Sequence, residues 1–258
     1  MSGAPLRLTW AQVNDIGMRA ENQDHVGVAR NGELTCFVVA DGTGGYTGGA
    51  LASQLVVDAM LAAFCAAPAC DTSSLRAAVG AASASLAQAR SIDPARAEMS
   101  STVAALVVDA AAAQAVWTHL GDSRVYLFRA NRLHSVTIDH SLARQLVDNS
   151  RTGYGALRTH PQRHILLAAI GEENGMEPST SAGATRLQAG DALLLCSDGL
   201  WEWIDEGEME VALAVTTRSE DWLATMCDVA DKAFAATSKI RDNFSACAIR
   251  VHAAGEAA

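Results

Sequence analysis

The sequence predicts an α+β fold in which β-sheets are covered by helices that come in pairs. Half of the 258 residues are hydrophobic and 19% are charged, which is typical of a folded chain with a large core. Short apolar runs that end at Gly, Asp or polar residues indicate buried strands. The helical segments do not follow each strand in turn, so the sequence lacks the βαβ alternation of a doubly wound parallel sheet.

Strands are predicted where an apolar run is long enough to cross a sheet and stops at a polar residue. Three such runs follow one another closely between residues 115 and 137, as in an antiparallel meander. The predicted strands are residues 35–40, 102–109, 115–120, 124–129, 133–137, 191–196 and 244–251.

Helices are predicted where apolar residues recur every three or four positions. The first two candidates are rich in alanine, and the last carries Trp222, Met226 and Val229 at helical spacing. The predicted helices are residues 48–67, 75–90, 142–149 and 220–236.

The least regular stretch is residues 150–163. It contains Gly153, Gly155, Pro161 and several basic residues. A connection of this length in a compact domain is usually functional or mobile. The chain length suits one large domain or two small ones, and a single domain over residues 1–258 is the simpler interpretation.

Charge and cysteine content exclude several classes of function. The chain has 19 Lys and Arg against 29 Asp and Glu, a net charge of −10, and no basic block, so we expect no nucleic-acid partner. Residues 48–67 are interrupted by Ser53, Gln54 and Asp58, so we expect no membrane span. The six cysteines form no CxxC pair, which argues against a thiolate zinc site and favours a cytoplasmic chain with reduced thiols.

The chemical signal is a set of aspartates at the ends of apolar strands. Asp41 and Asp198 each follow a predicted strand, Asp122 lies between two strands, and Asp242 precedes the last one. A carboxylate at such a position costs free energy unless it is paired, hydrogen-bonded or bound to a metal. Four of them in an acidic chain indicate a shared divalent ion, and all-oxygen ligands favour Mg²⁺ or Mn²⁺ over zinc. The alternative is that each aspartate caps a helix or makes a turn.

Glycine surrounds the first of these aspartates, from Asp41 to Gly49, where it allows the backbone to approach a ligand closely. The Gly-Lys-Ser/Thr element of a nucleotide P-loop is absent from this stretch. Its glycines also lack the spacing of a dinucleotide fingerprint.

Short motifs recur in a defined order between about Gly17 and Val251. The chain carries Arg19-Ala20-Glu21-Asn22-Gln23-Asp24, Val39-Ala40-Asp41-Gly42-Thr43-Gly44-Gly45, Ser100-Ser101-Thr102, Gly121-Asp122-Ser123-Arg124, Asp139-His140-Ser141, His160-Pro161-Gln162-Arg163, Ala169-Ile170-Gly171, Ser197-Asp198-Gly199-Leu200 and Asp242-Asn243. This series resembles the metal-dependent Ser/Thr protein phosphatases of the type 2C family, in particular the bacterial members.

The resemblance implies a central sandwich of two antiparallel β-sheets flanked by helix pairs, in four αββα layers. It also implies two Mg²⁺ or Mn²⁺ ions at one end of the sandwich. Asp41 would bridge the ions, the Gly42 carbonyl would bind one of them, and Asp198 and Asp242 would complete the other.

Three further residues receive roles from the same resemblance. Asp122, with Asp198, corresponds to the place where bacterial relatives hold a third and weaker ion. By the resemblance, Arg19 corresponds to the phosphate-binding arginine of the family, whose planar guanidinium suits two phosphate oxygens. Asp24 would hold a water molecule that is bound to an ion.

Two positions depart from the family pattern. Gln23 stands where many relatives carry Glu, so the affinity for metal is expected to fall slightly. Thr43 stands where some eukaryotic relatives carry a His that is their proposed general acid. His140 and His160 are alternatives, but a lone His is more often structural, and the sequence assigns no general acid.

The expected function is hydrolysis of phosphoserine and phosphothreonine on proteins by a metal-activated water, opposing a Ser/Thr kinase in bacterial signalling or secretion control. Residues 148–165 would form a flap, in which Arg151 and Arg158 could favour acidic phosphosites. Glu177, Glu202 and the acidic segment 206–210 are expected on the solvated surface, and Trp201 and Trp203 in the core or at its rim. The alternatives are a catalytically silent phosphoprotein-binding regulator on the same fold and a phosphohydrolase of nucleotides or small molecules.

Overall fold

The computed structural model describes residues 5–43, 48–149, 154–172 and 176–255. Its strands are β1 (Leu6–Asp15), β2 (Asp24–Asn31), β3 (Leu34–Thr43), β4 (Ser100–Ser101), β5 (Val103–Asp109), β6 (Gln114–Leu120), β7 (Arg124–Arg129), β8 (Arg132–Val136), β9 (Ser179–Thr180), β10 (Thr185–Arg186), β11 (Ala192–Cys196) and β12 (Phe244–Ala253). The helices are α1 (Gly49–Ala66), α2 (Thr72–Ile92), η2 (Pro94–Arg96), α3 (Leu142–Asp148), η3 (Tyr154–Leu157), α4 (Asp198–Trp201), α5 (Glu206–Ala214) and α6 (Ser219–Ala235).

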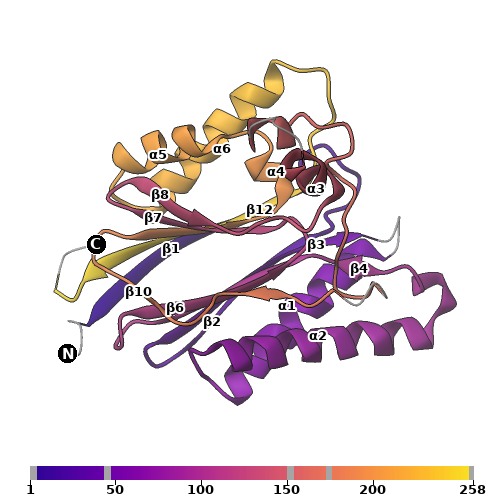
Figure 1. Ribbon diagram of the computed structural model, residues 1–258, viewed down its shortest axis with the longest axis horizontal. Helices are drawn as coiled ribbons and strands as arrows, with labels where there is room; N and C mark the ends of the chain where they lie inside the picture. The colour runs from indigo at the N-terminus through magenta and orange to yellow at the C-terminus, as the bar shows by residue number, and fades with distance from the viewer. Residues whose placement is uncertain (1–4, 44–47, 150–153, 173–175, 256–258) are drawn as a thin grey trace.

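Two antiparallel sheets lie face to face between layers of helices (Figure 1). The first sheet has the order β1-β12-β11-β7-β8 and is covered by α5 and α6. The second has the order β10-β6-β5-β3-β2 and is covered by α1 and α2. The α+β prediction and the four-layer arrangement implied by the family resemblance are confirmed.

Burial on both faces explains why the central strands are continuously apolar rather than alternating. In β3, Phe37 and Val39 point into the core between the two sheets, whereas Val38 points toward α1 and α2. In β11, Leu193 faces the other sheet and Leu194 faces the helices of the first layer. The six cysteines are all free, and Cys36, Cys196 and Cys247 are buried in these cores.

Helix α1 is the one helix, among the residues described, whose length and mean hydropathy of 1.6 would suit a membrane span. Its side chains Ala52, Val56 and Met60 are buried in the core beneath the second sheet. Packing against the sheet and α2 therefore accounts for the apolar character of α1.

Two strands and one helix of substantial length were absent from the prediction. β1 and β2 are the edge strands of their sheets, so their residues are mostly half-buried and form no continuous apolar run. α5 occupies the acidic segment that was predicted to be solvated surface. It begins with a capping box, in which Asp205 and Glu208 each accept a hydrogen bond from the other's backbone N–H.

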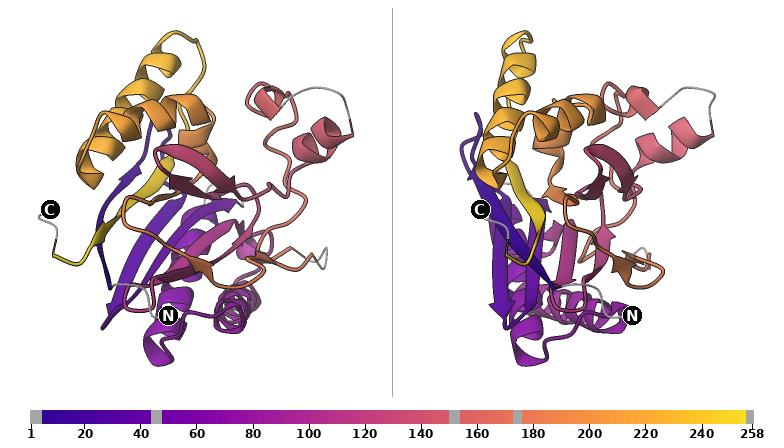
Figure 2. Two further views of the ribbon diagram at one scale, coloured as in Figure 1. Left: turned by 60° about the vertical axis from the view of Figure 1, so that its left-hand side comes forward. Right: turned by 90° about the vertical axis from the view of Figure 1, so that its left-hand side faces the viewer.

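The predicted flap stands away from the sandwich. Figure 2 shows α3, which ends where this segment begins, and η3, which lies within it, projecting to one side of the sheets. The two helices form a small cluster of their own, in which Ala143 and Val147 of α3 pack on Leu157 of η3. Arg151 and Gly153 of the flap prediction lie outside the described residues, as do Gly44 and Gly45 of the glycine-rich segment.

Candidate active site

Strand register brings two of the predicted aspartates together at one end of the second sheet. β2 begins at Asp24, which pairs directly with Asp41 near the end of β3. The backbone of Asp41 is fixed further by Thr102, whose Oγ1 accepts a hydrogen bond from the Asp41 N–H at 3.0 Å and whose own N–H donates to the Asp41 carbonyl at 2.8 Å. The Ser100-Ser101-Thr102 motif therefore holds the bridging position of the predicted metal site in place.

The first sheet delivers the other three aspartates to the same end of the molecule. Cys196, the last residue of β11, pairs with Arg124 of β7 and with Ala246 of β12. The segments that carry Asp122, Asp198 and Asp242 consequently leave the sheet side by side, although they are far apart in the sequence.

Hydrogen bonds, a buried ion pair and close backbone packing hold these segments in position. Nε1 of Trp201 donates a hydrogen bond to the Asp122 carbonyl at 2.9 Å, and the ring of Trp201 lies 3.5 Å below the guanidinium carbon of Arg124. Arg124 in turn forms a buried pair with Asp139, with both N···O distances at 2.7 Å. A Cβ on Gly199 would lie 2.0 Å from the Asn243 carbonyl, so only glycine permits the segment after β11 to pass the start of β12.

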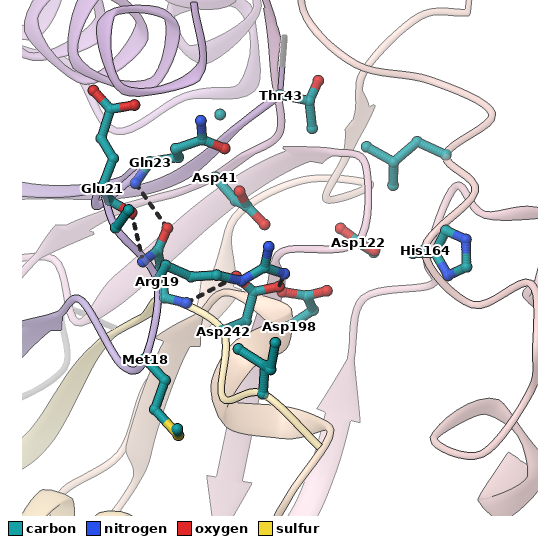
Figure 3. Close-up of a pocket in the computed structure, with 15 residues that line it drawn as sticks. Met18, Arg19, Glu21, Gln23, Asp41, Thr43, Asp122, His164, Asp198 and Asp242 are labelled. Atoms are coloured by element: carbon teal, nitrogen blue, oxygen red, sulfur yellow. Dashed lines mark hydrogen bonds and ion pairs between the residues drawn. The ribbon is translucent and has the colours of Figure 1, made fainter. Parts of the chain in front are cut away.

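The aspartates surround one pocket with a volume of about 580 Å³ (Figure 3). Arg19 lies on one side of the carboxylates, and the ring of His164 lies on the other, beside Asp122. The pocket is lined by Met18, Arg19, Ala20, Glu21, Gln23, Asp41, Gly42, Thr43, Asp122, His164, Leu166, Asp198, Ile240, Asp242 and Asn243. All the predicted site residues except Asp24 line it.

Asp24 lies behind the pocket rather than in its wall. Its carboxylate is 3% exposed and accepts a hydrogen bond from the Ser197 hydroxyl at 2.6 Å. Ser197 directly precedes Asp198, so Asp24 links β2 of one sheet to the segment after β11 of the other. This position suits a supporting role and not direct contact with an ion.

The pocket concentrates negative charge that the protein itself does not neutralise. The pKa values of Asp41 and Asp198 are raised well above the ordinary value of an aspartate, mainly by burial and in addition by repulsion from the neighbouring carboxylates. Burial also raises the pKa of Asp122 and of Asp24 to about 7. Such a set of oxygen donors fits hard divalent cations, which would supply the charge that these carboxylates lack.

The backbone near Asp41 also fits a closely bound ion. A Cβ on Gly42 would lie 1.9 Å from the Gly49 carbonyl, so the chain can pass here only because residue 42 is glycine. As the side chains stand, no three His, Cys, Asp or Glu residues of the described chain converge tightly enough to hold one ion. The carboxylate of Asp242 is turned to Arg19, with an N···O distance of 2.5 Å.

Comparison with known proteins agrees with this geometry. A family model described as Protein phosphatase 2C matches residues 15–245. The chain belongs to the protein phosphatase 2C family. Within this family it is 33% identical over 222 residues to the serine/threonine protein phosphatase PstP of Mycobacterium tuberculosis. The aligned residues cover 85% of this chain but only 41% of that relative's length. The chain is 32% identical over 218 residues to the serine/threonine phosphatase stp of Listeria monocytogenes, covering 82% of this chain and 83% of the relative.

Solved structures of protein phosphatase 2C members superpose on most of the chain. The Mycobacterium tuberculosis phosphatase PstP/Ppp matches with a TM-score of 0.79 and 29% identity, covering 95% of this chain and 99% of that one. The PstP catalytic domain in complex with two manganese ions matches with a TM-score of 0.80 and 28% identity, covering 96% and 99%. PppA, described as a key regulatory component of T6SS in Pseudomonas aeruginosa, matches with a TM-score of 0.75 and 30% identity, covering 96% and 100%.

The structure corrects three expectations for the surface near the protein phosphatase 2C site. Glu202 is not solvated: its side chain is 12% exposed and pairs with Arg163 at 2.5 Å. Glu206 is partly buried and pairs with Arg158 at 2.8 Å. Arg158 also donates to the carbonyls of Trp201 and Ile204, so this basic residue fastens the flap to the segment after Asp198 and is not directed at a substrate.

The histidine that enters the pocket is neither of the two that the sequence suggested. His140 is stacked on His119, with ring centroids 4.6 Å apart, and its Nε2 lies 2.8 Å from the Ser179 hydroxyl. Burial and the neighbouring His119 lower the pKa of His140 to about 4. Neither His140 nor His160 lines the pocket, whereas His164 does. In the sequence, only the place of His164 directly after the His160–Arg163 motif could have pointed to it.

Proposed function

We propose that the chain hydrolyses phosphoserine and phosphothreonine on proteins with the help of two Mg²⁺ or Mn²⁺ ions. The observation that carries this proposal is the convergence of four aspartates from both sheets, beside one arginine, in a single pocket. The names of the relatives supply the substrate class, and the fold supplies the scaffold. A nucleotide or small-molecule substrate is not favoured, because carboxylates line the pocket and its described lining residues include no Phe, Tyr or Trp on which a base could stack.

The metal ligands in this proposal are the carboxylates gathered at one end of the sandwich. Asp41 would contact both ions. The Gly42 carbonyl would complete the coordination of one ion, and Asp198 and Asp242 would complete the coordination of the other. Asp122 and Asp198 could hold a third ion. When bound, the ions supply an activated water for attack on phosphorus and neutralise the phosphoryl oxygens.

Arg19 binds and orients the phosphoryl group. Its side chain is 51% exposed and lies at the pocket, where it pairs with Asp242. If the Asp242 carboxylate binds an ion, it no longer pairs with Arg19. The guanidinium of Arg19 can then bind two phosphate oxygens. This planar pair of contacts fixes the phosphorus for in-line attack.

His164 protonates the leaving oxygen. A seryl or threonyl alkoxide is a poor leaving group, so a proton donor is needed when the P–O bond breaks. The imidazole of His164 faces the pocket across from Arg19 and makes no hydrogen bond with the described part of the chain. Thr43, whose hydroxyl lies 2.5 Å from that of Ser100, is a poor proton donor near neutral pH.

Asp41→Asn tests the proposal, with Asp58→Asn as the matched control because Asp58 is exposed on α1 and lies outside the pocket. Phosphopeptide hydrolysis and bound Mn²⁺ per chain are measured for both. We expect the Asp41 variant to lose about a thousandfold in activity and to bind less metal, because one carboxylate charge between the ions is removed. Retained activity would overturn the metal-dependent mechanism. Wild-type protein that binds phosphopeptides without cleaving them would favour the silent regulator.

The setting of this activity is part of the proposal. We place the enzyme in the bacterial cytoplasm, as one catalytic domain over residues 1–258 with a flap at residues 148–165, where it opposes a Ser/Thr protein kinase in signalling. The names of its relatives support the reaction class, and the six free cysteines suit a reducing compartment.

A further inference from the structure

Large apolar side chains are exposed beside the active-site pocket, on the side of Arg19. Met18 is 62% exposed, Ile240 is 68% exposed and Ile16 is 43% exposed. Met18 and Ile240 both line the pocket. Figure 3 shows the Met18 side chain directed away from the aspartates. We refer to Ile16, Met18 and Ile240 as the apolar rim.

The apolar rim comes from two loops that are fixed to each other. The Met18 N–H donates to the Arg241 carbonyl at 3.0 Å, and Nδ2 of Asn243 donates to the Ile16 carbonyl at 2.8 Å. Gly17 has φ +60°, and a Cβ at this residue would lie 2.2 Å from the Asp242 carbonyl. Because the two loops are held this closely, the rim is formed before any ligand binds and little ordering is required on binding.

We propose that the apolar rim binds a large apolar side chain of the phosphoprotein substrate, close in sequence to the phosphorylated residue. This inference rests on the proposed function, because it concerns the substrate of the same site. Leu, Ile, Met or Phe near the phosphosite should therefore be preferred over small polar residues.

Continuity with the phosphate-binding group identifies the occupant. Met18 directly precedes Arg19, and Ile240 lies two residues before Asp242, the partner of Arg19. A polypeptide whose phosphate contacts Arg19 therefore has one of these side chains within reach. Extended chains rise about 3.3 Å per residue, so a side chain within roughly three positions of the phosphosite can reach the rim.

The charge around the rim argues against an anionic lipid surface as the occupant. Glu21 and four aspartates line the adjoining pocket, and the chain carries a net charge of −10. These groups repel anionic headgroups, whereas an uncharged side chain beside a single phosphate gains from burial on the rim.

The experiment compares phosphothreonine peptides that differ only by Leu or Ser at one position, from three residues before the phosphosite to three after it. We measure kcat/KM for each peptide and take the Leu/Ser ratio within each protein, which cancels any change in overall activity. The wild-type protein should show a ratio of about 10 at its best position, as expected for burial of one apolar side chain.

Met18→Ser/Ile240→Ser is the rim variant, and it should bring the ratio to within about twofold of unity. Val211→Ser/Val215→Ser is the matched control, since these side chains of α5 and its C-cap are 65% and 71% exposed and lie outside the pocket. The control should keep the wild-type ratio.

A wild-type ratio near unity at every position would overturn the inference, as would a preference that survives in the rim variant. Both results leave the proposed function standing, because the peptides are still hydrolysed. Wild-type protein that hydrolyses no phosphopeptide would overturn the proposed function, and this inference with it.

Discussion

Removal of divalent metal should make the stability of this protein fall as the pH rises. Asp24 and Asp122 are 3% and 4% exposed, and burial raises the pKa of each from 3.8 to about 7 in the folded chain. The folded state therefore binds protons more tightly than the unfolded chain does. Stability from these groups is full below about pH 4 and is lost as the pH rises toward 7.

The size of this loss follows from the shift. About three pKa units correspond to roughly 4 kcal/mol for one fully shifted aspartate. Repulsion between the carboxylates is counted in the pKa of each, so this free energy is an upper bound for one group. In a chain of this length, 1 kcal/mol changes the thermal midpoint by about 2–4 °C. We therefore expect the metal-free midpoint to fall by about 10 °C between pH 5 and pH 8.

Thermal unfolding followed by circular dichroism measures this effect, in EDTA and in excess Mn²⁺ at pH 5, 6, 7 and 8. Manganese should restore the midpoint most at pH 8, where the carboxylates are charged, and least at pH 5. Asp24→Asn keeps the shape of the side chain without its charge, so it should flatten the metal-free pH dependence. Equal midpoints at all pH values in EDTA would refute the electrostatic account of the pocket.

Three further substitutions separate the roles of individual residues. Arg19→Lys should lower kcat/KM for a phosphopeptide by about 10- to 100-fold while bound metal is kept, because the planar two-oxygen contact is lost; unchanged kinetics would contradict the assignment. His164→Gln should lose about 100-fold more activity on a phosphoserine peptide than on p-nitrophenyl phosphate, whose leaving group needs no proton; equal losses on both would argue against proton donation. Arg158→Ala should lower the free energy of unfolding by about 2–3 kcal/mol, measured by urea titration, without changing the preference for acidic phosphosites; a changed preference would restore its proposed contact with substrate.

The central strands could be predicted because burial on both faces makes their residues continuously apolar in the sequence. β3 and β11 are continuous apolar runs, since one face meets the other sheet and the opposite face meets helices. β1 and β2 form no such run, because an edge strand places fewer side chains in a core. α5 carries Glu206 and Glu208 in its first turn, and only its capping box distinguishes it from a solvated loop.

The site could be predicted in part for the same reason. Asp41 and Asp198 stand out because a carboxylate directly after a buried strand requires a partner. The structure gathers both in one pocket with Asp122 and Asp242, and their role as metal ligands stays a prediction. His164 and Arg158 could not be assigned, because both belong to the irregular segment between α3 and β9, where no periodic pattern fixes the direction of a side chain.

The sequence alone determined the fold class, the strand ends that carry aspartate, and the family, because these depend on local patterns of polarity and on short motifs. The tertiary structure alone decided which side chains share the pocket. Arg158 is turned to the Trp201 carbonyl, His164 faces the aspartates, and Met18 lies beside Ile240 at the rim. Such pairings join residues far apart in the chain, and their geometry is set by sheet register and by the packing of layers, which no single segment encodes.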